Sequence, residues 1–565
     1  MGALHLVLAP WAAVLGLLAL QLCAASNVID RSLEAEAAPP SVPASIVSPL
    51  LRTGHHFQPP KNWINAPMYH KGWYHLFYQY NPKNPVWGHI VWAHAVSRDL
   101  INWIGLEPAI VPSIPSDRYG CWSGSATILH DGTPAITYTG ITRPDIDYEV
   151  QNVAFPKNKS DPLLREWVKP AAYNPIAVPD AGINATQFRD PSTAWYADGH
   201  WRMLVGGARD HRGLAFVYRS RDFKRWVRAK HPLHSALTGM WECPDFFPVA
   251  GAGQQHGLHT SEPGVKYVLK NSLDRLRYDY YTVGKYDKDK DRYVPDDPNG
   301  DQHHMRYDYG NFYASKTFYD PVKQRRIHPL GMGQRVRQRG RRLGQGLGRH
   351  LCTIWLAPNG KQLLQWPIEE LEKLRGKAVI VNGTAVKPGH HFEVTGLQVY
   401  RSDVEVSFEV SSLAKAEPFD PAYADDAQKL CGVKGGVGPF GLWVLASANL
   451  KERTSVFFRV FDDTDGKHKV LCIDPTSSTQ RDVYKPTSAG FVDVDTSAGK
   501  ISLRTLIDGS VVETFGAGGK TCILSRVYPS LARGKDARLY VFNNGETDIK
   551  VRDLAVWEMR KASMM

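Results

Sequence analysis

Between residues 55 and 319 the chain is a succession of short runs rich in aromatic and β-branched residues, each ended by Gly, Pro, Asn or Asp. The runs include GWYHLFYQY, HIVWAHAV and YDYYTVGKYD, and almost none has the period of a helix. Many short strands with regular turn signals are typical of sandwiches, barrels and propellers. One internal repeat favours the propeller, because SRDLINW at 97–103 recurs as SRDFKRW at 220–226, as if one unit were reused.

The pattern changes in the last third of the chain. PIEELEKLRGK at 367–377 is the only convincing amphipathic helical stretch, and longer alternating strands such as LQVYRSDVEVSFEVSSL follow residue 396. Such strands are typical of a β-sandwich. The sequence therefore predicts an all-β protein, with a propeller-like domain over 51–366, a linker with a short helix over 367–395 and a sandwich over 396–565.

The N-terminus indicates secretion. Residues 1–26 give an apolar run followed by small residues, which is the pattern of a signal peptide, and 27–50 read as a flexible segment. The alternative is a retained membrane anchor, although Pro10 leaves the apolar run barely long enough to span a bilayer. Three Asn-x-Ser/Thr sequons, at Asn158, Asn184 and Asn382, agree with secretion as glycosylation sites.

Cysteine usage and charge narrow the class further. Seven cysteines are too few for a disulfide scaffold, and no cluster of Cys and His has zinc-ligand spacing, so no metal site is expected. Cys431 and Cys472 flank strand-like segments and form a candidate disulfide, whereas Cys121 and Cys243 are expected to be buried thiols.

The formal net charge of +12 suits adhesion to an acidic polysaccharide. Nucleic acid is the rival partner for a basic protein, but acidic and basic residues are interspersed and a signal peptide argues against it. No segment after the signal peptide could span a membrane.

Two acidic residues lie in apolar segments bounded by turns. Asp190 stands between Arg189 and a proline in FRDPSTAW, and Glu242 stands among aromatic residues in MWECPDFFPV. Burial among apolar groups raises the pKa of a carboxyl, which suits a general acid. The alternatives are a surface turn for Asp190 and a buried structural role for Glu242. One ionised and one protonated carboxyl are what the hydrolysis of a glycosidic bond requires.

Other motifs extend this interpretation along nearly the whole mature chain. The motifs are HHFQPPKNWIN, FYQYNP, VWGHIVWAH, WSGSAT, FRDP, WECPDFFPV, FYASKTFYDP and DGSVVETFGAGGKTCILSRVYP. In order and wording they closely resemble glycoside hydrolase family 32, the invertases and fructan hydrolases of plants. The resemblance implies a five-bladed β-propeller carrying the active site in its central funnel, followed by a β-sandwich. It also implies a retaining mechanism on β-fructofuranosides that needs no metal or organic cofactor.

The resemblance assigns roles to residues of this sequence. Glu242 matches the acid/base of the family, Asp190 matches its transition-state stabiliser, and the nucleophilic Asp is expected directly after Asn65. The substrate contacts that it implies are Trp63, Asn65, Gln79, Trp87, Trp122, Ser123, Arg189, Asp190, Glu242, Asp274 and Arg277. A sugar is the implied substrate, and a proteinaceous invertase inhibitor is an implied partner.

Two features bear on specificity and location. Pro244 in WECPD resembles the cell-wall subgroup, which implies an extracellular, apoplastic enzyme. SLDRLRYDYY places Asp274 with Arg277 where sucrose-cleaving members have an Asp and a basic residue. Fructan exohydrolases often lack that Asp, so invertase is favoured and fructan exohydrolase stays the alternative.

The sequence departs from the family at its nucleophile. Where the family box reads tryptophan, a hydrophobic residue and Asn-Asp-Pro-Asn, this chain runs from Asn65 straight into Ala66 and Pro67. Asp-Pro-Asn is therefore missing, although the flanks are intact. In plant genes of this family the tripeptide is typically encoded by its own very short exon, so a skipped exon is the most economical explanation.

A second departure follows Ile327, where relatives continue with a WGWANES-type segment. Codons permitted for residues 330–338 can be chosen so that, read one nucleotide later, they give WGWANESD. Residues 328–352 are thus interpreted as a frame-shifted stretch, and its six Arg without any acid supply about half of the +12 charge. The sequence leaves two hypotheses: a β-fructofuranosidase whose true product contains both missing pieces, or a catalytically dead paralogue that binds sucrose or fructans.

Overall fold

The computed structural model describes part of the chain at the level of individual residues. The described ranges are 52–57, 63–83, 88–180, 182–250, 265–328, 332–333, 337–338, 341–342, 349–424, 426–432, 436–462, 469–483, 485–492 and 500–564. The side chains of 63–65, 80, 332–333, 337–338, 341–342 and 469 are not included. The predicted signal peptide over 1–26, the N-terminal segment over 27–50 and Trp87 lie outside these ranges.

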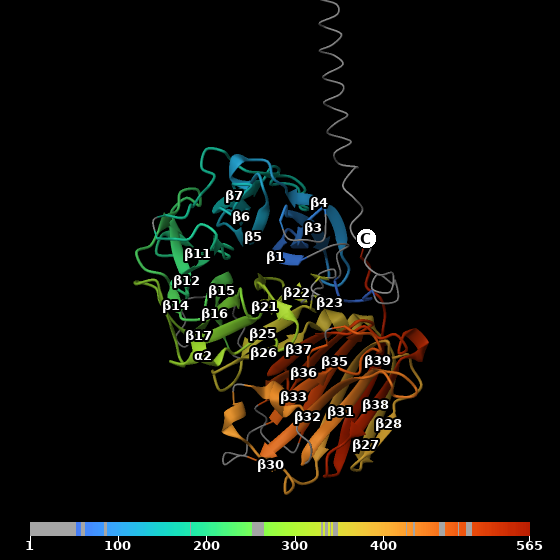
Figure 1. Ribbon diagram of the computed structural model, residues 1–565. Helices are drawn as coiled ribbons and strands as arrows, with labels where there is room; N and C mark the ends of the chain where they lie inside the picture. Colours follow the sequence, from blue (N-terminus) through green and yellow to red (C-terminus); the bar gives the residue numbers. More distant parts are fainter. Residues whose placement is uncertain are drawn as a thin grey trace, which may run out of the picture. The chain divides into compact units, whose positions relative to one another are not determined.

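Five antiparallel sheets follow one another from residue 63 to residue 367 (Figure 1). The first holds β1 (Trp63–His70), β2 (Trp73–Tyr80), β3 (Val91–Ser97) and β4 (Ile104–Ile110). The second holds β5 (Cys121–Ile128), β6 (Pro134–Ile141), β7 (Glu149–Pro156) and β8 (Trp167–Val168). The third holds β10 (Trp195–Ala197), β11 (His200–Arg209), β12 (Arg212–Ser220) and β13 (Val227–Arg228), joined by β9 (Phe188–Arg189) and β14 (His234–Ala236).

The remaining two sheets complete the set. The fourth holds β15 (Trp241–Val249), β16 (Lys266–Leu273), β17 (Asp279–Asp287) and β18 (Arg292–Pro295). The fifth holds β20 (Phe318–Asp320), β21 (Arg325–His328), β25 (Cys352–Leu356) and β26 (Leu363–Pro367). Each sheet is one blade, and contacts of β1 with both β5 and β20 bring the first blade against the second and the fifth. The predicted β-propeller is confirmed.

Burial explains why the strands of a blade differ in composition. All seven residues of β3 are buried, whereas β4 at the edge of the same sheet exposes Ile104 and buries only Ile110 fully. An inner strand is covered on both faces and reads as a continuous apolar run, while an edge strand keeps one face toward water.

The repeat seen in the sequence is one recurring turn between the third and fourth strands of a blade. In each copy a residue with positive φ is followed three positions later by a tryptophan whose Nε1 donates to the carbonyl of that residue. The copies are Leu100 and Trp103 at 3.2 Å, Phe223 and Trp226 at 3.3 Å, and Leu164 and Trp167 at 2.9 Å. The third copy, in the second blade, escaped the sequence comparison because its spacing before the turn differs.

Two further sheets form the C-terminal part. One holds β27 (Arg375–Val386), β39 (Ile549–Met559), β29 (Arg401–Val410), β35 (Ile501–Asp508), β36 (Val511–Gly516) and β37 (Thr521–Arg526). The other holds β28 (His390–Glu393), β38 (Arg538–Asn543), β31 (Val437–Ala446), β32 (Thr454–Asp462), β33 (Lys469–Asp474) and β34 (Ser488–Phe491), with β30 (Glu417–Pro418) paired to β32. One apolar core contains residues of both sheets, such as Val404, Ile507, Leu442 and Val456, as expected for a sandwich.

The boundary between the two parts differs from the expected one. The segment predicted as a linker contains β27, which pairs with β39 from Arg375 to Val386 and so belongs to the sandwich. Its residues are mostly exposed or half-buried, which is why they carry no strong strand signal. The expected amphipathic helix is the short 3-10 helix η3 (Glu369–Leu374), which buries Leu371 and Leu374.

The other short elements are peripheral. They are η2 (Pro115–Asp117), α2 (Gly300–His303), η4 (Pro421–Tyr423), α3 (Ala427–Leu430) and η6 (Gly534–Asp536), with the strand pairs β19 (Phe312–Tyr313) and β22 (Met332–Gly333), and β23 (Arg337–Gln338) and β24 (Arg341–Arg342). Within the described part of the chain, none of the helices has the length and apolar character needed to traverse a lipid bilayer.

Candidate active site

Bulges place the predicted site residues at the start of three blades. β1, β5 and β15 are each the first strand of a sheet, and each has an irregular register near its beginning. The irregularities enclose Trp122 and Ser123 on β5, and Cys243 with Pro244 directly after Glu242 on β15. A bulge re-aims side chains that would otherwise alternate across the sheet, and bulges are frequent beside active sites.

Arg189, on the third blade, joins two carboxyl groups from the blades on either side of it. At the end of β9 its guanidinium donates from Nη2 to Glu242 Oε1 at 2.8 Å and from Nη1 to Glu149 Oε1 at 2.7 Å. Glu149 begins β7, and its other oxygen accepts the backbone N–H of Phe188 at 2.5 Å. The three side chains thus form a chain of charge-assisted hydrogen bonds across the second, third and fourth blades.

Burial makes both of these carboxyls easier to protonate. Burial raises the pKa of Glu242 to about 7, although the Arg189 guanidinium opposes the shift. Burial likewise raises the pKa of Glu149 to about 8 against the same guanidinium. At mildly acidic pH Glu242 therefore holds a proton that it can give away, which is the property expected of a general acid.

Asp190 lies in a strained and tightly held turn. Its φ is 67°, in the left-handed region, and its side chain is buried. Its Oδ2 accepts the backbone N–H of Cys243 at 2.9 Å, and the Cys243 thiol lies 3.4 Å from the same oxygen. Non-glycine residues in this conformation are held by their surroundings and cluster at functional sites. The hydrogen bond from Cys243 also holds the segment FRDP, which contains Asp190, against the segment WECPD.

Two buried lysines that sequence reasoning missed connect the same segments. Lys316 Nζ lies 3.4 Å from the carbonyl of Asp190 and 3.2 Å from that of Pro244. Lys270 Nζ donates to the carbonyl of Cys243 at 2.9 Å. Glu149 was also missed, because a single Glu in a strand-like run gives no local signal of its charged partner 40 residues away.

Asp274 and Arg277 form a pair at the edge of this group. Arg277 Nη2 is 3.2 Å from Asp274 Oδ1, and its Nη1 lies 4.0 Å from Glu242 Oε2. Both side chains keep contact with solvent, with 31% of Asp274 and 44% of Arg277 exposed. The structure therefore brings together Arg189, Asp190, Glu242, Asp274 and Arg277, five of the predicted site residues.

The other predicted substrate contacts come from the first two blades. Gln79 is buried on β2, and its amide oxygen and nitrogen have no hydrogen-bond partner among the described residues. Trp122 and Ser123 are buried on β5, and Trp122 Nε1 donates to the carbonyl of Gly88 at 3.1 Å. Trp63 and Asn65 lie on β1, but their side chains are not among the described ones. Trp87 lies outside the described residues altogether.

The junction where Asp-Pro-Asn is missing coincides with the bulge on β1. Ile64 pairs with Tyr78 and Pro67 pairs with Leu76, so Asn65 and Ala66 together stand opposite Phe77. Ala66 is buried. The strand thus accommodates the junction by an irregular register, and a side chain that cannot act as a nucleophile occupies the position after Asn65.

The interpreted frame-shifted stretch is described mainly at its two ends. His328 closes β21, buried, with Nε2 2.9 Å from Ser315 Oγ. Arg349 and His350 are buried before Cys352 starts β25, and both contact Glu513 of the sandwich. The stretch therefore supplies core residues of the fifth blade despite its unusual composition.

The predicted modification sites are accessible, and the candidate disulfide forms. Asn158, Asn184 and Asn382 are all exposed. Cys431 and Cys472 are joined by a disulfide between α3 and β33. Cys121 and Cys243 are buried free thiols.

The described residues also include one group that could hold a metal ion. Ligand nitrogens of His55, His56 and His350 all lie within 4.8 Å of one another, and no member belongs to the Glu242 group. No local spacing could indicate this group, because His350 lies 295 residues beyond His55.

Two models of one protein family match successive parts of the chain. The sequence model described as "Glycosyl hydrolases family 32 N-terminal domain" matches residues 56–367. The model described as "Glycosyl hydrolases family 32 C terminal" matches residues 370–558.

Relatives match over almost the whole chain. The "Beta-fructofuranosidase, cell wall isozyme" of Zea mays is 71% identical, over 99% of this chain and 98% of that protein. The "Beta-fructofuranosidase, insoluble isoenzyme 1" of Oryza sativa subsp. indica is 69% identical over 100% of both. The crystal structure of fructan 1-exohydrolase IIa from Cichorium intybus superposes with a TM-score of 0.86 at 44% identity, covering 92% of this chain and 99% of that one.

Proposed function

Because the chain belongs to glycosyl hydrolase family 32, we propose that it is built as a secreted β-fructofuranosidase for sucrose and that, as written, it lacks the nucleophile of that reaction. The observation that carries the proposal is Arg189 held between Glu149 and Glu242, directly beside Asp190. This arrangement supplies a protonated carboxyl and a fixed carboxylate on adjacent blades.

The reaction assigns a separate task to each carboxyl. Glu242 protonates the glycosidic oxygen as the bond to the fructosyl carbon breaks, while a second carboxylate attacks that carbon to form an ester. Glu242 then removes a proton from the water that cleaves the ester. Asp190 lies beside the fructosyl ring in this assignment, where its carboxylate stabilises the positive charge of the transition state. With the pKa of Glu242 at about 7, the acid is protonated at mildly acidic pH and activity falls as the pH rises above that value.

No described residue near Glu242 is free to replace the missing nucleophile. Residues 54–98 contain no Asp or Glu, so the first blade offers no carboxylate between β1 and β3. Glu149 is engaged by Arg189 and Phe188, Asp190 by Cys243, and Asp274 by Arg277. Retaining hydrolysis needs two carboxyls about 5–5.5 Å apart, and an amide such as Asn65 cannot form the ester.

Sucrose is favoured over fructans by the Asp274 and Arg277 pair. A polar pair at the edge of the site can donate and accept hydrogen bonds to the glucosyl unit of sucrose. Fructan exohydrolase is the second candidate function, because the chicory enzyme, which was also solved as a variant in complex with 1-kestose, superposes closely.

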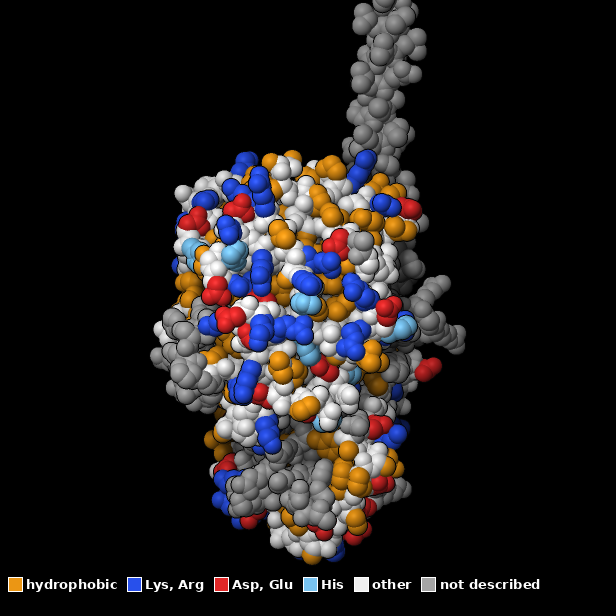
Figure 2. Space-filling model, turned by 90° about the vertical axis from the view of Figure 1, so that its left-hand side faces the viewer, with side chains coloured by type: hydrophobic (Ala, Val, Ile, Leu, Met, Phe, Trp, Pro, Cys, Tyr) orange, Lys and Arg blue, Asp and Glu red, His pale blue; other side chains and the backbone are white. Residues whose placement is uncertain are grey.

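The names of the relatives support an extracellular location, and the charge of the surface is consistent with it. The maize relative is named a cell wall isozyme, and the rice relative is named insoluble. Figure 2 shows Lys and Arg side chains gathered across one face, with Asp and Glu scattered among them. Exposed basic residues of the third blade include Arg209, Arg212, Arg221, Lys224, Arg225 and Lys230. We expect this charge to hold the protein on acidic wall polysaccharide after secretion, and a proteinaceous inhibitor is a further expected partner.

The test compares two chains. One is the chain as written, and the other carries Asp-Pro-Asn between Asn65 and Ala66 with 328–352 restored to the alternative frame. We expect sucrose hydrolysis from the repaired chain alone. Comparable activity in both would refute the missing-nucleophile argument, and an inactive but folded repaired chain would refute the assignment of function. Sequencing transcripts across both junctions shows which chain the plant makes.

A further inference from the structure

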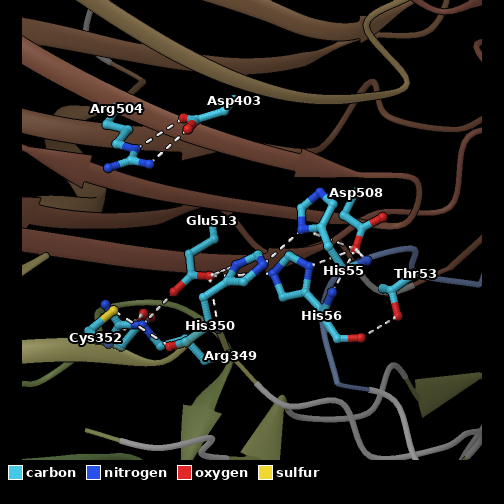
Figure 3. Close-up of polar contacts among 11 residues, drawn as sticks. Thr53, His55, His56, Arg349, His350, Cys352, Asp403, Arg504, Asp508 and Glu513 are labelled. Carbon is cyan, nitrogen blue, oxygen red and sulfur yellow. Dashed lines mark hydrogen bonds and ion pairs between the residues drawn. The ribbon is translucent and has the colours of Figure 1, made fainter. Parts of the chain in front are cut away.

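A second group of buried ionisable side chains lies where the start of the propeller meets the sandwich (Figure 3). His55 and His56 precede β1, His350 precedes β25, Asp508 ends β35 and Glu513 lies on β36. All five side chains are buried, so each polar atom must find its partner inside the protein.

The nitrogens of the three histidine rings form two sets: outer nitrogens that contact carboxylates, and inner nitrogens that face the other histidines. His56 Nδ1 is 2.9 Å from Asp508 Oδ2, and His350 Nδ1 is 2.9 Å from Glu513 Oε2. On the inner side, His350 Nε2 is 2.8 Å from His55 Nδ1. His56 Nε2 makes no hydrogen bond with a described residue, although Glu513 Oε2 is 3.3 Å away. Two histidines thus give one nitrogen to a carboxylate and turn the other toward a shared centre.

We propose that His55, His56 and His350 form a binding site for one divalent transition-metal ion of the zinc type. Imidazole nitrogens are typical ligands of Zn²⁺, at about 2.0–2.1 Å. Metal-bound histidines almost always donate their second N–H to a carboxylate or carbonyl, which fixes the tautomer and the orientation of the ring. Asp508 and Glu513 provide this arrangement for His56 and His350.

Carboxylates stand behind the histidine rings. Asp508 Oδ2 accepts the backbone N–H of His56 at 2.9 Å and lies 2.9 Å from the ring nitrogen Nδ1 of the same residue. Arg349 and Arg401 contact the outer oxygens of Glu513 and Asp508, at 2.5 and 3.2 Å. The inner carboxylate oxygens therefore face the histidine rings, while the outer oxygens face the guanidinium groups.

Protons compete with a metal ion for these rings. Histidine binds a metal only through an unprotonated nitrogen, so any proton on an inner nitrogen must leave before the ion binds. A cavity of about 20 Å³ adjoins the cluster, with His55, Arg349 and His350 as the polar residues of a mainly apolar lining.

The ion would have a structural role. It would link residues 55–56 and 350 to strands β35 and β36, whose carboxylates belong to the sandwich. None of the ligands lies in the Glu242 group, so binding should not depend on an active catalytic site. Because His350 lies within 328–352, the site is a property of the chain as written.

The test uses the full chain, stripped of metal with a chelator and titrated with Zn²⁺ and then with Co²⁺. We expect one ion per chain, micromolar affinity or tighter, and the strong visible absorption of four-coordinate Co²⁺. The variant His350→Ala should bind Zn²⁺ at least a hundredfold more weakly. The matched control is His94→Ala, since His94 is also buried and contacts another histidine, His75, at 3.0 Å, but has no place in the cluster.

A second variant tests the carboxylate behind the His350 ring. Glu513→Gln keeps the shape of the side chain and removes the charge behind His350, and such changes typically weaken metal affinity about 10–100-fold. Equal affinity in the parent chain, His350→Ala and Glu513→Gln would overturn the proposal. So would the weak absorption of six-coordinate Co²⁺ in the parent chain, a result that needs no variant to fold.

Discussion

Two buried groups of carboxyls in this protein respond to burial in opposite ways. On β7 and β15, burial raises the pKa of Glu149 and Glu242 to about 8 and about 7, although both contact Arg189. On β35 and β36, the pKa values of Asp508 and Glu513 lie well below their usual range, although both side chains are as fully buried as that of Glu149. Depth alone therefore does not determine whether a carboxyl is a proton donor or a fixed anion.

The difference lies in the number of donors that each carboxylate receives. Glu149 and Glu242 share one guanidinium. Asp508 accepts three backbone N–H groups, from Gly54, His55 and His56, besides the His56 ring and the Arg401 guanidinium. A carboxylate with several donors stays ionised, whereas one that shares a single cation with another carboxyl keeps a proton within reach. The first arrangement suits a structural anion and the second suits acid catalysis.

The largest expected effect concerns catalysis by the first group. In the repaired chain, Glu242→Gln should lower kcat for sucrose about 10²–10⁴-fold, because the amide cannot transfer the proton. The measurement is initial rate at pH 5, with Glu166→Gln, an exposed member of an ion pair with Lys157, as the control. A loss below threefold would mean that Glu242 is not the acid.

The next effect concerns stability and the second group. Glu513→Gln should lower the free energy of unfolding by about 3–5 kcal/mol, because it leaves Arg349 buried without its anion. Urea unfolding at pH 7 measures it. The exposed Glu409, paired with Arg552, offers the control Glu409→Gln, which should change little. Equal free energies of unfolding in Glu513→Gln and Glu409→Gln would mean that Glu513 is not a stabilising buried anion, and the contrast with Glu149 and Glu242 would be lost.

A smaller effect is expected at the exposed edge of the first group. In the repaired chain, Asp274→Ala should weaken sucrose cleavage relative to short fructans about ten- to a hundredfold, as for a charge-assisted hydrogen bond of about 1.5–3 kcal/mol. The ratio of kcat/KM values for the two substrates measures it. Equal losses on both substrates would show that Asp274 does not contact the glucosyl unit.

Sequence reasoning found one group and missed the other for physical reasons. Glu242, Asp190 and Arg189 stand in motifs whose local sequence identifies them. The blades could be predicted from the pattern of short strands. Glu149 and His350 acquire their roles only through partners far along the chain, at Arg189 and Glu513. Their burial and pairing depend on how blades and sandwich meet, which no local pattern reports. The strand β27 was missed although Val379, Val381 and Val386 line its core face, because most of its residues are exposed or half-buried.

The last expected effect is gradual, and it tests the cause of the difference through the pH dependence of stability. The pKa of Glu149 is about 8 in the folded chain, and an unfolded Glu titrates near about 4.3, so folding takes up a proton between these values. Stability contributed by this group therefore falls as pH rises through that window, by up to about 1.4 kcal/mol per pH unit. Asp508 and Glu513 have depressed pKa values, so their contribution is complete above about pH 4.3 and is lost only as pH falls further.

Glu149→Gln isolates this slope. The amide keeps a hydrogen-bonding side chain toward Arg189 but cannot take up a proton, so the decline in unfolding free energy between pH 5 and pH 8 should become shallower than in the parent chain. Both chains keep His56, whose raised pKa gives a decline above pH 6.5 that cancels in the difference. Urea unfolding at four pH values in this range measures both slopes. Parallel curves would mean that Glu149 is ionised throughout, and that one shared guanidinium is enough to make a buried carboxyl a fixed anion.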